Sequence, residues 1–360
     1  MRRALKLAGR ALGRTAPNPL VGAVVVADGQ VVGEGCHHGP GTPHAEVHAL
    51  RAAGSKARGA TLYVTLEPCC HTNKRTPPCA PAVLAAGVKR VVIGMTDPNP
   101  AVSGGGARAL EAAGVAVFVG VEEAECQSLN APYIQVFNTG LPWVTLKMAQ
   151  TLDGKVATAS GDSKWITGKA ARRHGHRLRD RHEVILVGVG TVLADDPQLT
   201  CRIPAGRDPL PVVLDSNLST PVTARLLERS NGVRPILCAV EGVDPDRIDR
   251  LQTAGAEVLT TPAVNGRVDV SALLKVLAAR GMHRVLCEGG PTVAAALLAE
   301  GLVDRVACFI APMLMGGDDA RGSIGGASPL ALAGVRYLGK FSSRRLGSDI
   351  LLEADILRNG

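Results

Sequence analysis

Two series of alternating strand-like and helix-like segments, separated by one irregular stretch, constrain the fold of this chain more than any other feature. A short amphipathic helix built on Leu5, Ala8 and Leu12 is expected to come first and to end near Gly13. In the first series, apolar runs alternate with helix-like stretches at 44–53, 80–86 and 106–113; the runs lie at 21–27, 31–35, 61–66, 89–94 and 115–120. Asp28-Gly29 between the first two runs predicts a tight hairpin, because both residue types tolerate positive φ.

The second series begins at Trp143, after a stretch from 130 to 142 in which the periodicity lapses into Asn, Pro and Thr-Gly punctuation. Its strand-like runs lie at 143–148, 184–190, 211–215, 235–240, 283–288 and 305–311, and a hairpin is expected at 347–357. At 360 residues with 46% apolar content, the chain is long enough for two cores. We therefore predict two α/β domains, residues 1–142 and 143–360.

Charge and cysteine content limit the partners of such a chain. The first ten residues are charged throughout, unlike a signal peptide, and no run is long enough to span a bilayer, so we expect a cytoplasmic protein with no membrane partner. Nine cysteines without regular spacing fit a reducing compartment. The net charge of +8 is dispersed and aromatic residues make up only 2%, which argues against nucleic acid and favours a phosphorylated small molecule.

Residues with metal-ligand chemistry occur at three points of the first domain. His44-Ala45-Glu46 follows Pro43, which is expected to begin a helix, so His44 and Glu46 are predicted in its first turn. Cys69 follows the strand at 61–66, and Cys79 precedes the next helix. One imidazole and two thiolates make a zinc site with a fourth position open for water, whose pKa zinc lowers to about 7.

Glu46 lies two residues from a predicted ligand and is placed to carry protons from that water to a substrate, as in zinc deaminases. The alternative for each residue alone is an ordinary polar side chain or a buried core thiol. Cys70 is the competing ligand, but adjacent residues at a strand end point in different directions, so Cys69 is preferred.

With these residues identified, the chain resembles the bifunctional riboflavin biosynthesis family, in which diaminohydroxyphosphoribosylaminopyrimidine deaminase is fused to 5-amino-6-(5-phosphoribosylamino)uracil reductase. The resemblance covers nearly the whole chain. It is carried in the first half by Ala16-Pro-Asn-Pro19, Pro43-His-Ala-Glu-Val47, Thr65-Leu-Glu-Pro-Cys-Cys-His71, Arg75-Thr-Pro-Pro-Cys79 and Asp97-Pro-Asn-Pro100.

The resemblance implies a cytidine-deaminase-like three-layer sandwich with zinc on His44, Cys69 and Cys79, and with Glu46 as proton shuttle. It further implies that Asn18, His37 and His71 contact the phosphorylated aminopyrimidine. The cysteine spacing is one residue longer than the family pattern, which leaves open whether Lys74 or Arg75 meets the substrate. A homo-oligomer is also expected.

The second half carries weaker local signals. The run at 184–190 ends in glycines that would let a ligand approach the backbone closely. The run at 283–288 ends in Glu288 and is followed by Gly289-Gly290-Pro291-Thr292 and an alanine-rich helix, whose start would suit a cofactor phosphate. No Gly-x-Gly-x-x-Gly fingerprint occurs, so a Rossmann domain is not predicted.

The segments 146–149, 152–155, 161–167 and 190–197 look like the reductase domain of the same family, which is similar to dihydrofolate reductase. The resemblance implies hydride transfer from NADPH to the ribose C1′. The implied NADPH contacts are Ala149, Trp165, Thr191, Asp195, Gly290, Pro291 and Thr292. The implied contacts to the reductase substrate are Lys147, Ser163, Arg179, Leu199, Arg202 and Glu288.

Arg179 is one of five arginines on a predicted helix at 172–181 and is singled out because a guanidinium binds phosphate in a bidentate fork; the alternative is a solvated basic face. Local sequence alone does not separate NADPH from NADH. Two other functions remain alternatives at this point: a deaminase whose C-terminal half is a redox-inactive binding or oligomerisation module, and a nucleic-acid-editing protein.

Overall fold

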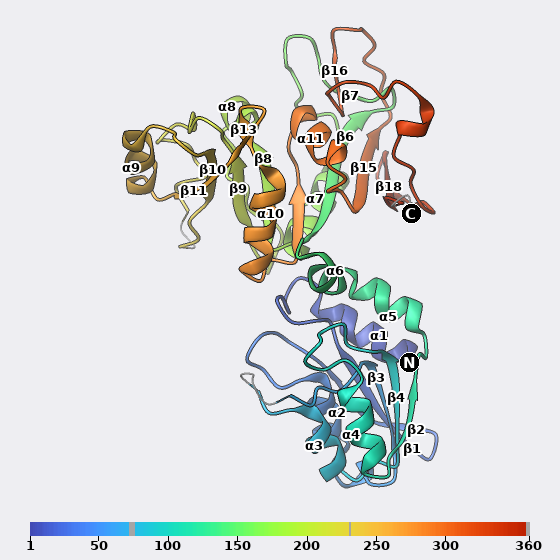
Figure 1. Cartoon of the computed structure of the whole chain (residues 1–360). Helices are drawn as coiled ribbons and strands as arrows, with labels where there is room; N and C mark the ends of the chain where they lie inside the picture. The colour runs from blue at the N-terminus through green and yellow to red at the C-terminus, as the bar shows by residue number, and fades with distance from the viewer. Residues whose placement is uncertain (72–75, 230–231, 358–360) are drawn as a thin grey trace. The chain divides into compact units, whose positions relative to one another are not determined.

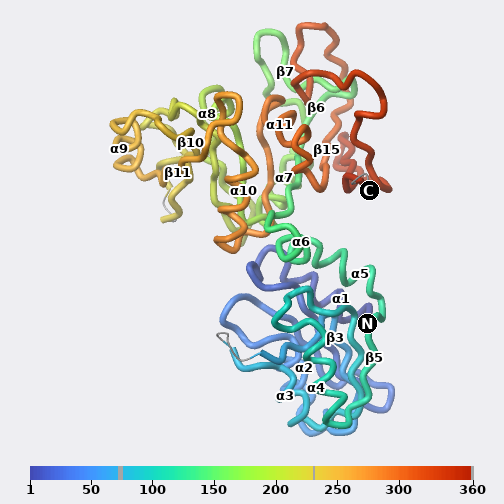
Figure 2. The backbone as a smooth tube through the Cα atoms, viewed as in Figure 1, coloured from blue at the N-terminus to red at the C-terminus, as the bar shows by residue number. Residues whose placement is uncertain are grey.

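The computed structural model describes residues 1–71, 76–229 and 232–357, and the chain divides into two compact units, Met1–Gly140 and Leu141–Gly360 (Figure 1). This division lies two residues before the predicted boundary. The backbone trace in Figure 2 completes the first unit before it enters the second. The stretch at 130–142 was predicted to be irregular, but it contains helix α6 (Ala131–Thr139). Pro132 stands in its first turn, where a missing N–H costs nothing, and Gly140 ends it with φ 70°.

The first unit is built on a five-stranded sheet with the order β2-β1-β3-β4-β5. The strands are β1 (Gly22–Ala27), β2 (Gln30–Cys36), β3 (Thr61–Leu66), β4 (Arg90–Met95) and β5 (Ala116–Val119). β1 is antiparallel to both neighbours, whereas β3, β4 and β5 are parallel. Asp28 and Gly29 join β1 to β2 with φ of 49° and 75°, which confirms the predicted hairpin.

Helices cover both faces of this sheet: α1 (Arg2–Ala8) and α5 (Glu123–Leu129) on one side, α2 (Ala45–Ala53) and α3 (Cys79–Ala85) on the other, with α4 (Gly105–Ala112) beside α3. Glycines in β1 and β2 allow α1 and α2 to approach the sheet closely. A Cβ on Gly22 would lie 2.0 Å from the Ala4 carbonyl oxygen of α1, and one on Gly35 would lie 2.4 Å from that of Ala45 in α2. Gly22 and Gly35 belong to neighbouring cross-strand pairs, so they point to opposite faces of the sheet. One face therefore packs against α1 and the other against α2, which gives the three layers of the predicted sandwich.

The second unit is built on a nine-stranded sheet with the order β11-β10-β9-β8-β14-β6-β15-β18-β17. Seven strands from β11 to β15 are mutually parallel, and β18 is antiparallel to both its neighbours. In chain order the strands are β6 (Trp143–Thr151), β8 (Val184–Gly188), β9 (Leu210–Leu214), β10 (Ile236–Val240), β11 (Glu257–Thr261), β14 (Arg284–Cys287), β15 (Arg305–Ala311), β17 (Ser342–Leu346) and β18 (Asp349–Asp355).

Helices again cover both faces. The helices are α7 (Lys169–Arg181), α8 (Val189–Asp195), α9 (Pro245–Thr253), α10 (Val270–Ala279) and α11 (Pro291–Ala299). Leu186 of β8 packs with α10 and α11, whereas the adjacent Ile185 packs with α9. Leu286 of β14 packs with α7 on that second face. Two short ribbons complete the unit, β7 (Lys155–Ala157) with β16 (Arg321–Gly322) and β12 (Ala263–Val264) with β13 (Arg267–Val268).

Several boundaries in this unit differ from prediction. β6 continues to Thr151 instead of ending at residue 148. The strand predicted to reach residue 190 ends at Gly188, because Val189 already begins α8. The final hairpin starts earlier than expected, with Gly347 in its turn rather than at its first residue; the polar sequence of β17 gave no strand signal. Among residues 1–71, 76–229 and 232–357, no helix combines the length and the apolar character needed to cross a membrane.

Candidate active sites

The structure brings His44, Cys69 and Cys79 together from three elements of the first unit. His44 precedes α2 with an extended backbone, Cys69 lies three residues beyond β3, and Cys79 is the first residue of α3. Nδ1 of His44 lies 3.5 Å from the Cys69 sulfur and 3.2 Å from the Cys79 sulfur. The prediction that His44 lies inside the first turn is wrong by one position, because φ −77° and ψ 167° make it the N-cap.

This cluster fits a zinc ion. Its three ligand atoms all lie within 4.8 Å of one another, and both cysteines are buried. The backbone N–H of Cys79 donates to the Cys69 sulfur at 3.3 Å, which stabilises negative charge on that sulfur. One imidazole and two thiolates are the donor set of a zinc site that keeps a position open. Cys70, the competing candidate, is not part of the cluster and instead lies beside Gly105.

Thr76, which had no predicted role, contacts the His44 imidazole. Its hydroxyl lies 3.1 Å from Nε2 of His44. With Nδ1 bound to a metal ion, Nε2 would carry the proton and donate a hydrogen bond to Thr76 Oγ1. Metal-binding histidines commonly have such a partner on the second ring nitrogen. The only sequence signal was the position of Thr76 within the Arg-Thr-Pro-Pro-Cys segment.

Glu46 lies in the first turn of α2 and is buried, with 3% of its surface exposed. Its Oε2 has no hydrogen-bond partner among the residues that the structure describes. Burial raises the pKa of this carboxyl, and the negative charge of Cys69 adds to the effect. A buried carboxyl with one free oxygen beside a metal-ligand cluster can exchange protons with a molecule bound there.

Two of the predicted substrate contacts of the first unit lie next to the cluster. Asn18 Nδ2 donates to His37 Nε2 at 2.9 Å, and the other ring nitrogen of His37 donates to the Pro43 carbonyl at 3.3 Å. The rings of His37 and His44 meet edge to face at 5.2 Å. Burial lowers the pKa of His37, so the ring is held neutral.

The remaining predicted contacts of this unit are less defined. His71 lies two residues beyond Cys69, and its buried Nδ1 lacks a partner within the described part of the chain. Lys74 and Arg75 lie outside the described residues. They are therefore not placed relative to the cluster.

Glu67 is a structural residue that the sequence analysis quoted without assigning a role. Its carboxylate accepts backbone N–H groups of Gly104 at 2.8 Å, Ala107 at 3.0 Å and Asp97 at 3.3 Å. It thereby caps the start of α4 and ties the segment 97–107 to the end of β3. Glu67 fixes the chain two residues before Cys69.

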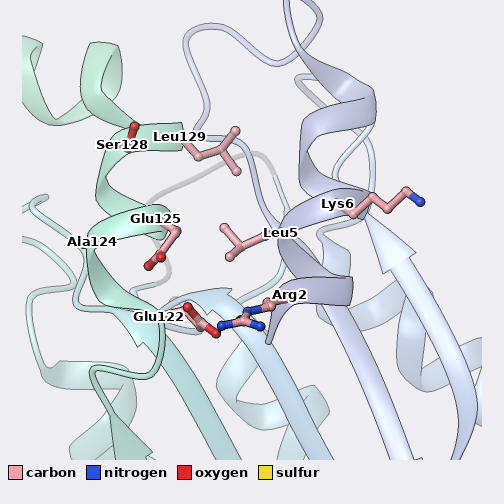
Figure 3. A pocket seen from close by; sticks show the side chains of 8 residues that line it. All are labelled: Arg2, Leu5, Lys6, Glu122, Ala124, Glu125, Ser128 and Leu129. Carbon is pink, nitrogen blue, oxygen red and sulfur yellow. Dashed lines mark hydrogen bonds and ion pairs between the residues drawn. The ribbon is translucent and has the colours of Figure 1, made fainter. Parts of the chain in front are cut away.

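A separate hollow of about 720 Å³ lies between α1 and α5 (Figure 3). These helices cover the face of the sheet opposite to α2 and α3, so the hollow is remote from the His44 cluster. The Arg2 guanidinium and the Glu122 carboxylate form an ion pair of 2.8 Å at one end of it. Its lining consists of Arg2, Leu5, Lys6, Glu122, Ala124, Glu125, Ser128 and Leu129.

In the second unit, Lys147, Arg179 and Glu288 form one charged cluster. Glu288 follows β14 and accepts two hydrogen bonds from Arg179 of α7, at 2.8 and 3.0 Å. Lys147 of β6 lies 3.7 Å from the same carboxylate. Burial opposes the charge on Glu288, but the neighbouring charges of Arg179 and Lys147 prevail and lower its pKa to about 2.

This pairing corrects the reasoning that singled out Arg179. The Nε and Nη2 edge, which was predicted to hold a phosphate in a bidentate fork, is occupied by Glu288, and Nη1 donates to the Thr200 carbonyl at 2.9 Å. Arg202, by contrast, is exposed and lies beside His176 of α7, at 3.4 Å between Nε and Nε2. Leu199 is buried with φ 53°, and Ser163 is half-buried on the segment before α7.

Several of the predicted cofactor contacts lie at the starts of α8 and α11. Gly188 precedes α8 and Gly290 precedes α11, with Pro291 in the first turn. A Cβ on Gly188 or on Gly289 would come within 2.9 Å of Val293 in α11, so the two helix starts lie close together. Thr191 and Asp195 belong to α8, Thr292 to α11 and Ala149 to β6.

Trp165 is attached to this region through its neighbours. Lys164 forms an ion pair of 3.0 Å with Asp195, and the Arg172 guanidinium lies 4.4 Å from the centre of the Trp165 ring. The indole itself is 66% exposed. Arg172 covers one face of the ring, and the exposed remainder of the indole could contact a planar ligand.

Comparison with known proteins assigns both units. Residues 1–95 match the model of the cytidine and deoxycytidylate deaminase zinc-binding region, and residues 142–352 match that of the RibD C-terminal domain. The riboflavin biosynthesis protein RibD of Bacillus amyloliquefaciens is 45% identical over 98% of this chain and 95% of its own length; that of Actinobacillus pleuropneumoniae is 43% identical over 98% and 93%.

Solved structures agree with these matches. RibD of Acinetobacter baumannii superposes with a TM-score of 0.87 at 39% identity, covering 99% of this chain and 98% of that one. A protein of Thermotoga maritima, described as a diaminohydroxyphosphoribosylaminopyrimidine deaminase/5-amino-6-(5-phosphoribosylamino)uracil reductase, superposes with a TM-score of 0.85 at 38% identity, covering 99% of this chain and 97% of that one. The likeness therefore extends over both units of the chain.

Proposed function

The chain belongs to the RibD family of riboflavin biosynthesis enzymes, which combine a zinc-dependent deaminase with an NADPH-dependent reductase, and from this premise we propose which residues perform each reaction. His44, Cys69 and Cys79 hold the zinc ion of the deaminase. Lys147, Arg179 and Glu288 form the substrate end of the reductase site. The observation that carries the first assignment is the convergence of one imidazole and two thiolates within 4.8 Å.

In the deaminase, zinc supplies a Lewis acid that lowers the pKa of a water molecule to near neutrality. Glu46 would accept one proton from the attacking water and pass it to the pyrimidine ring nitrogen, and would then carry the second proton of that water to the departing ammonia. Burial, which raises its pKa, favours the protonated carboxyl that this second transfer requires. Thr76 keeps the His44 ring in the orientation that directs Nδ1 to the metal.

The pyrimidine is held by Asn18, His37 and His71. The Asn18 amide is oriented by its bond to His37, which leaves its carbonyl oxygen to accept from an exocyclic amine. His37 stays neutral, so it adds no charge that would repel the zinc ion. Either Lys74 or Arg75 meets the substrate phosphate.

In the reductase, NADPH supplies the hydride that reduces the ribose C1′. Glu288 holds Arg179 and Lys147 in a fixed arrangement, because its carboxylate contacts both. Arg202 supplies the guanidinium that pairs with the substrate phosphate, and Leu199 and Ser163 complete that side. The paired starts of α8 and α11 present backbone N–H groups suited to the cofactor phosphates, with Thr191 and Thr292 beside them and Asp195 at the other end of α8. Trp165 and Ala149 complete the NADPH contacts.

The substrate proposed for the deaminase is 2,5-diamino-6-(5-phosphoribosylamino)pyrimidin-4-one, and its product is the substrate of the reductase. The similar protein of Thermotoga maritima, a diaminohydroxyphosphoribosylaminopyrimidine deaminase/5-amino-6-(5-phosphoribosylamino)uracil reductase, supports both. The earlier expectations of a homo-oligomer and of a cytoplasmic location stay predictions. Analytical ultracentrifugation and cell fractionation test them.

Substitution of Glu46 by Gln separates the two reactions. The variant keeps the shape of the side chain but cannot shuttle protons, so ammonia release falls by about 10²-fold or more while zinc content and NADPH oxidation with the deaminated substrate stay at the wild-type level. Unchanged ammonia release would refute the shuttle assignment. Absence of NADPH oxidation in the folded wild-type protein would instead favour a redox-inactive second unit.

A further inference from the structure

An irregular segment between α8 and β9, residues 197–209, carries the proposed substrate contacts Leu199 and Arg202; we call it the rim loop. It lies against α7, because the Thr200 carbonyl accepts from Arg179 and the Arg202 N–H donates to His176 Nδ1 at 3.3 Å. The loop has no strand or helix of its own to fix its shape. Its conformation therefore depends on side-chain contacts, both within the loop and from outside it.

Arg229 is such a side chain. It comes from the segment after β9, and only 3% of its side chain is exposed. Nη1 donates to the carbonyl of Gln198 at 3.1 Å, at the start of the rim loop, and Nη2 donates to that of Pro209 at 3.4 Å, at its end. Nη2 also lies 3.3 Å from the Asp208 carboxylate.

Asp208, which contacts Arg229, also binds the backbone in the middle of the rim loop. Its Oδ1 accepts the N–H of Cys201 at 2.7 Å, next to Arg202. Arg229 therefore joins both ends of the rim loop and, through Asp208, the backbone beside Arg202. Burying a guanidinium is costly, and burial lowers the pKa of Arg229, so its contacts must compensate for the lost hydration.

We propose that Arg229 is a positioning residue of the reductase, which holds the rim loop in the shape that presents Leu199 and Arg202 to the phosphorylated end of the reductase substrate. This proposal rests on the proposed contact of Arg202 with that substrate. Arg229 itself touches neither substrate nor cofactor. Its effect is to spare the loop an ordering cost when substrate binds.

The test uses the full chain and the variants Arg229→Met and Arg229→Lys, with NADPH oxidation measured against the deaminated substrate. We expect the KM for that substrate to rise about tenfold in Arg229→Met and less in Arg229→Lys, which keeps the charge. The kcat, the KM for NADPH and ammonia release stay within twofold of wild type. The matched control is Arg234→Met, because Arg234 also donates to three backbone acceptors, those of Gln252, Gly255 and Ala256, away from the rim loop.

Limited proteolysis gives a second readout, since trypsin cleaves after Arg202 and Arg207 only when the rim loop leaves α7. Cleavage at these two bonds is expected to accelerate in both Arg229 variants and not in Arg234→Met. If Arg229→Met does not fold, Arg229→Lys decides by both measurements. The proposal is overturned if the folded Arg229 variants show both an unchanged KM for the deaminated substrate and unchanged cleavage. It is also overturned if the KM for NADPH rises as much as the KM for the deaminated substrate.

The variant Arg202→Ala separates this proposal from the proposed function. If the KM for the deaminated substrate rises in Arg202→Ala but not in the Arg229 variants, only the positioning role of Arg229 is overturned. An unchanged KM in Arg202→Ala overturns the substrate contact on which the proposal depends. Faster loop cleavage without a change in KM means that Arg229 has a purely structural role, which also overturns it.

Discussion

From His182, the C-cap of α7, we predict how acid changes the stability of the second unit. Its Nδ1 donates to the Leu178 carbonyl at 2.7 Å, and its Nε2 accepts from the Thr145 hydroxyl at 3.0 Å, so the buried imidazole is neutral with both nitrogens bonded. Burial lowers its pKa from 6.5 to about 4, and the charges of Arg284 and Arg305 act in the same direction. The unfolded chain therefore binds a proton here more readily than the folded one.

The sign of the effect follows from this difference. Stability contributed by the neutral ring is fully present above pH 6.5 and is lost as the pH falls through about 4. The whole interval corresponds to roughly 3 kcal/mol, of which about 2 kcal/mol is lost between pH 7.5 and pH 5. This amount is a large part of the stability of an ordinary domain.

Tryptophan fluorescence isolates the second unit in the full chain, because both tryptophans, Trp143 and Trp165, belong to it. Urea denaturation is followed at pH 7.5 and pH 5 for wild type and for His182→Gln. The variant is expected to be less stable at pH 7.5 by about 1 to 2 kcal/mol, since Gln cannot reproduce both hydrogen bonds. Its loss of stability on going to pH 5 is about 2 kcal/mol smaller than that of wild type.

Carboxyl groups also begin to titrate near pH 5, so the effect of His182 is read from the difference between wild type and His182→Gln. The control His38→Gln changes an exposed histidine of the first unit and leaves the tryptophan transition unaltered at both pH values. An identical pH dependence in wild type and His182→Gln refutes the assignment of a buried neutral imidazole.

Three further outcomes are expected. Gly22→Ala places a Cβ 2.0 Å from the Ala4 carbonyl oxygen, so α1 must move; thermal unfolding followed by circular dichroism will show the first unit less stable by about 2 to 3 kcal/mol, with the tryptophan transition unchanged. Cys69→Ser loses zinc to a chromophoric chelator at least 100-fold more readily than wild type, whereas Cys70→Ser does not; equal retention by both would exclude Cys69 as ligand. Glu288→Gln leaves two cations without their counter-charge, which lowers the stability of the second unit by about 3 kcal/mol and raises the KM for the reductase substrate, while the Kd for NADPH, measured by fluorescence titration, is unchanged.

Sequence periodicity located most strands because apolar runs that are buried on both faces carry a strong local signal. β3 was predicted at its observed bounds, and the Asp28-Gly29 turn was identified from two residues. Helix α6 was missed, since Pro132 and Asn130 were interpreted as loop residues although proline is well tolerated at a helix start. β17 was missed because its exposed Ser-Ser-Arg-Arg sequence has no apolar face to recognise.

The candidate sites divide in the same way. His44, Cys69 and Cys79 were identifiable because their chemistry is unusual and their spacing is distinctive. The pairing of Arg179 with Glu288 was not, since it joins residues 109 positions apart and depends on how α7 packs on β14. Arg229 and Glu67 escaped notice for a related reason: they act through backbone groups, which any sequence can provide.

The strand order of the second unit separates two kinds of change that the reductase can tolerate. Lys147 and the residue before Glu288 lie on β6 and β14, adjacent strands in the interior of the sheet, whose amide protons will exchange with solvent only on global opening. The rim loop is fastened by a few side chains instead. Changes of sequence in the rim loop can therefore alter its shape without disturbing the two interior strands that carry Lys147 and lead to Glu288.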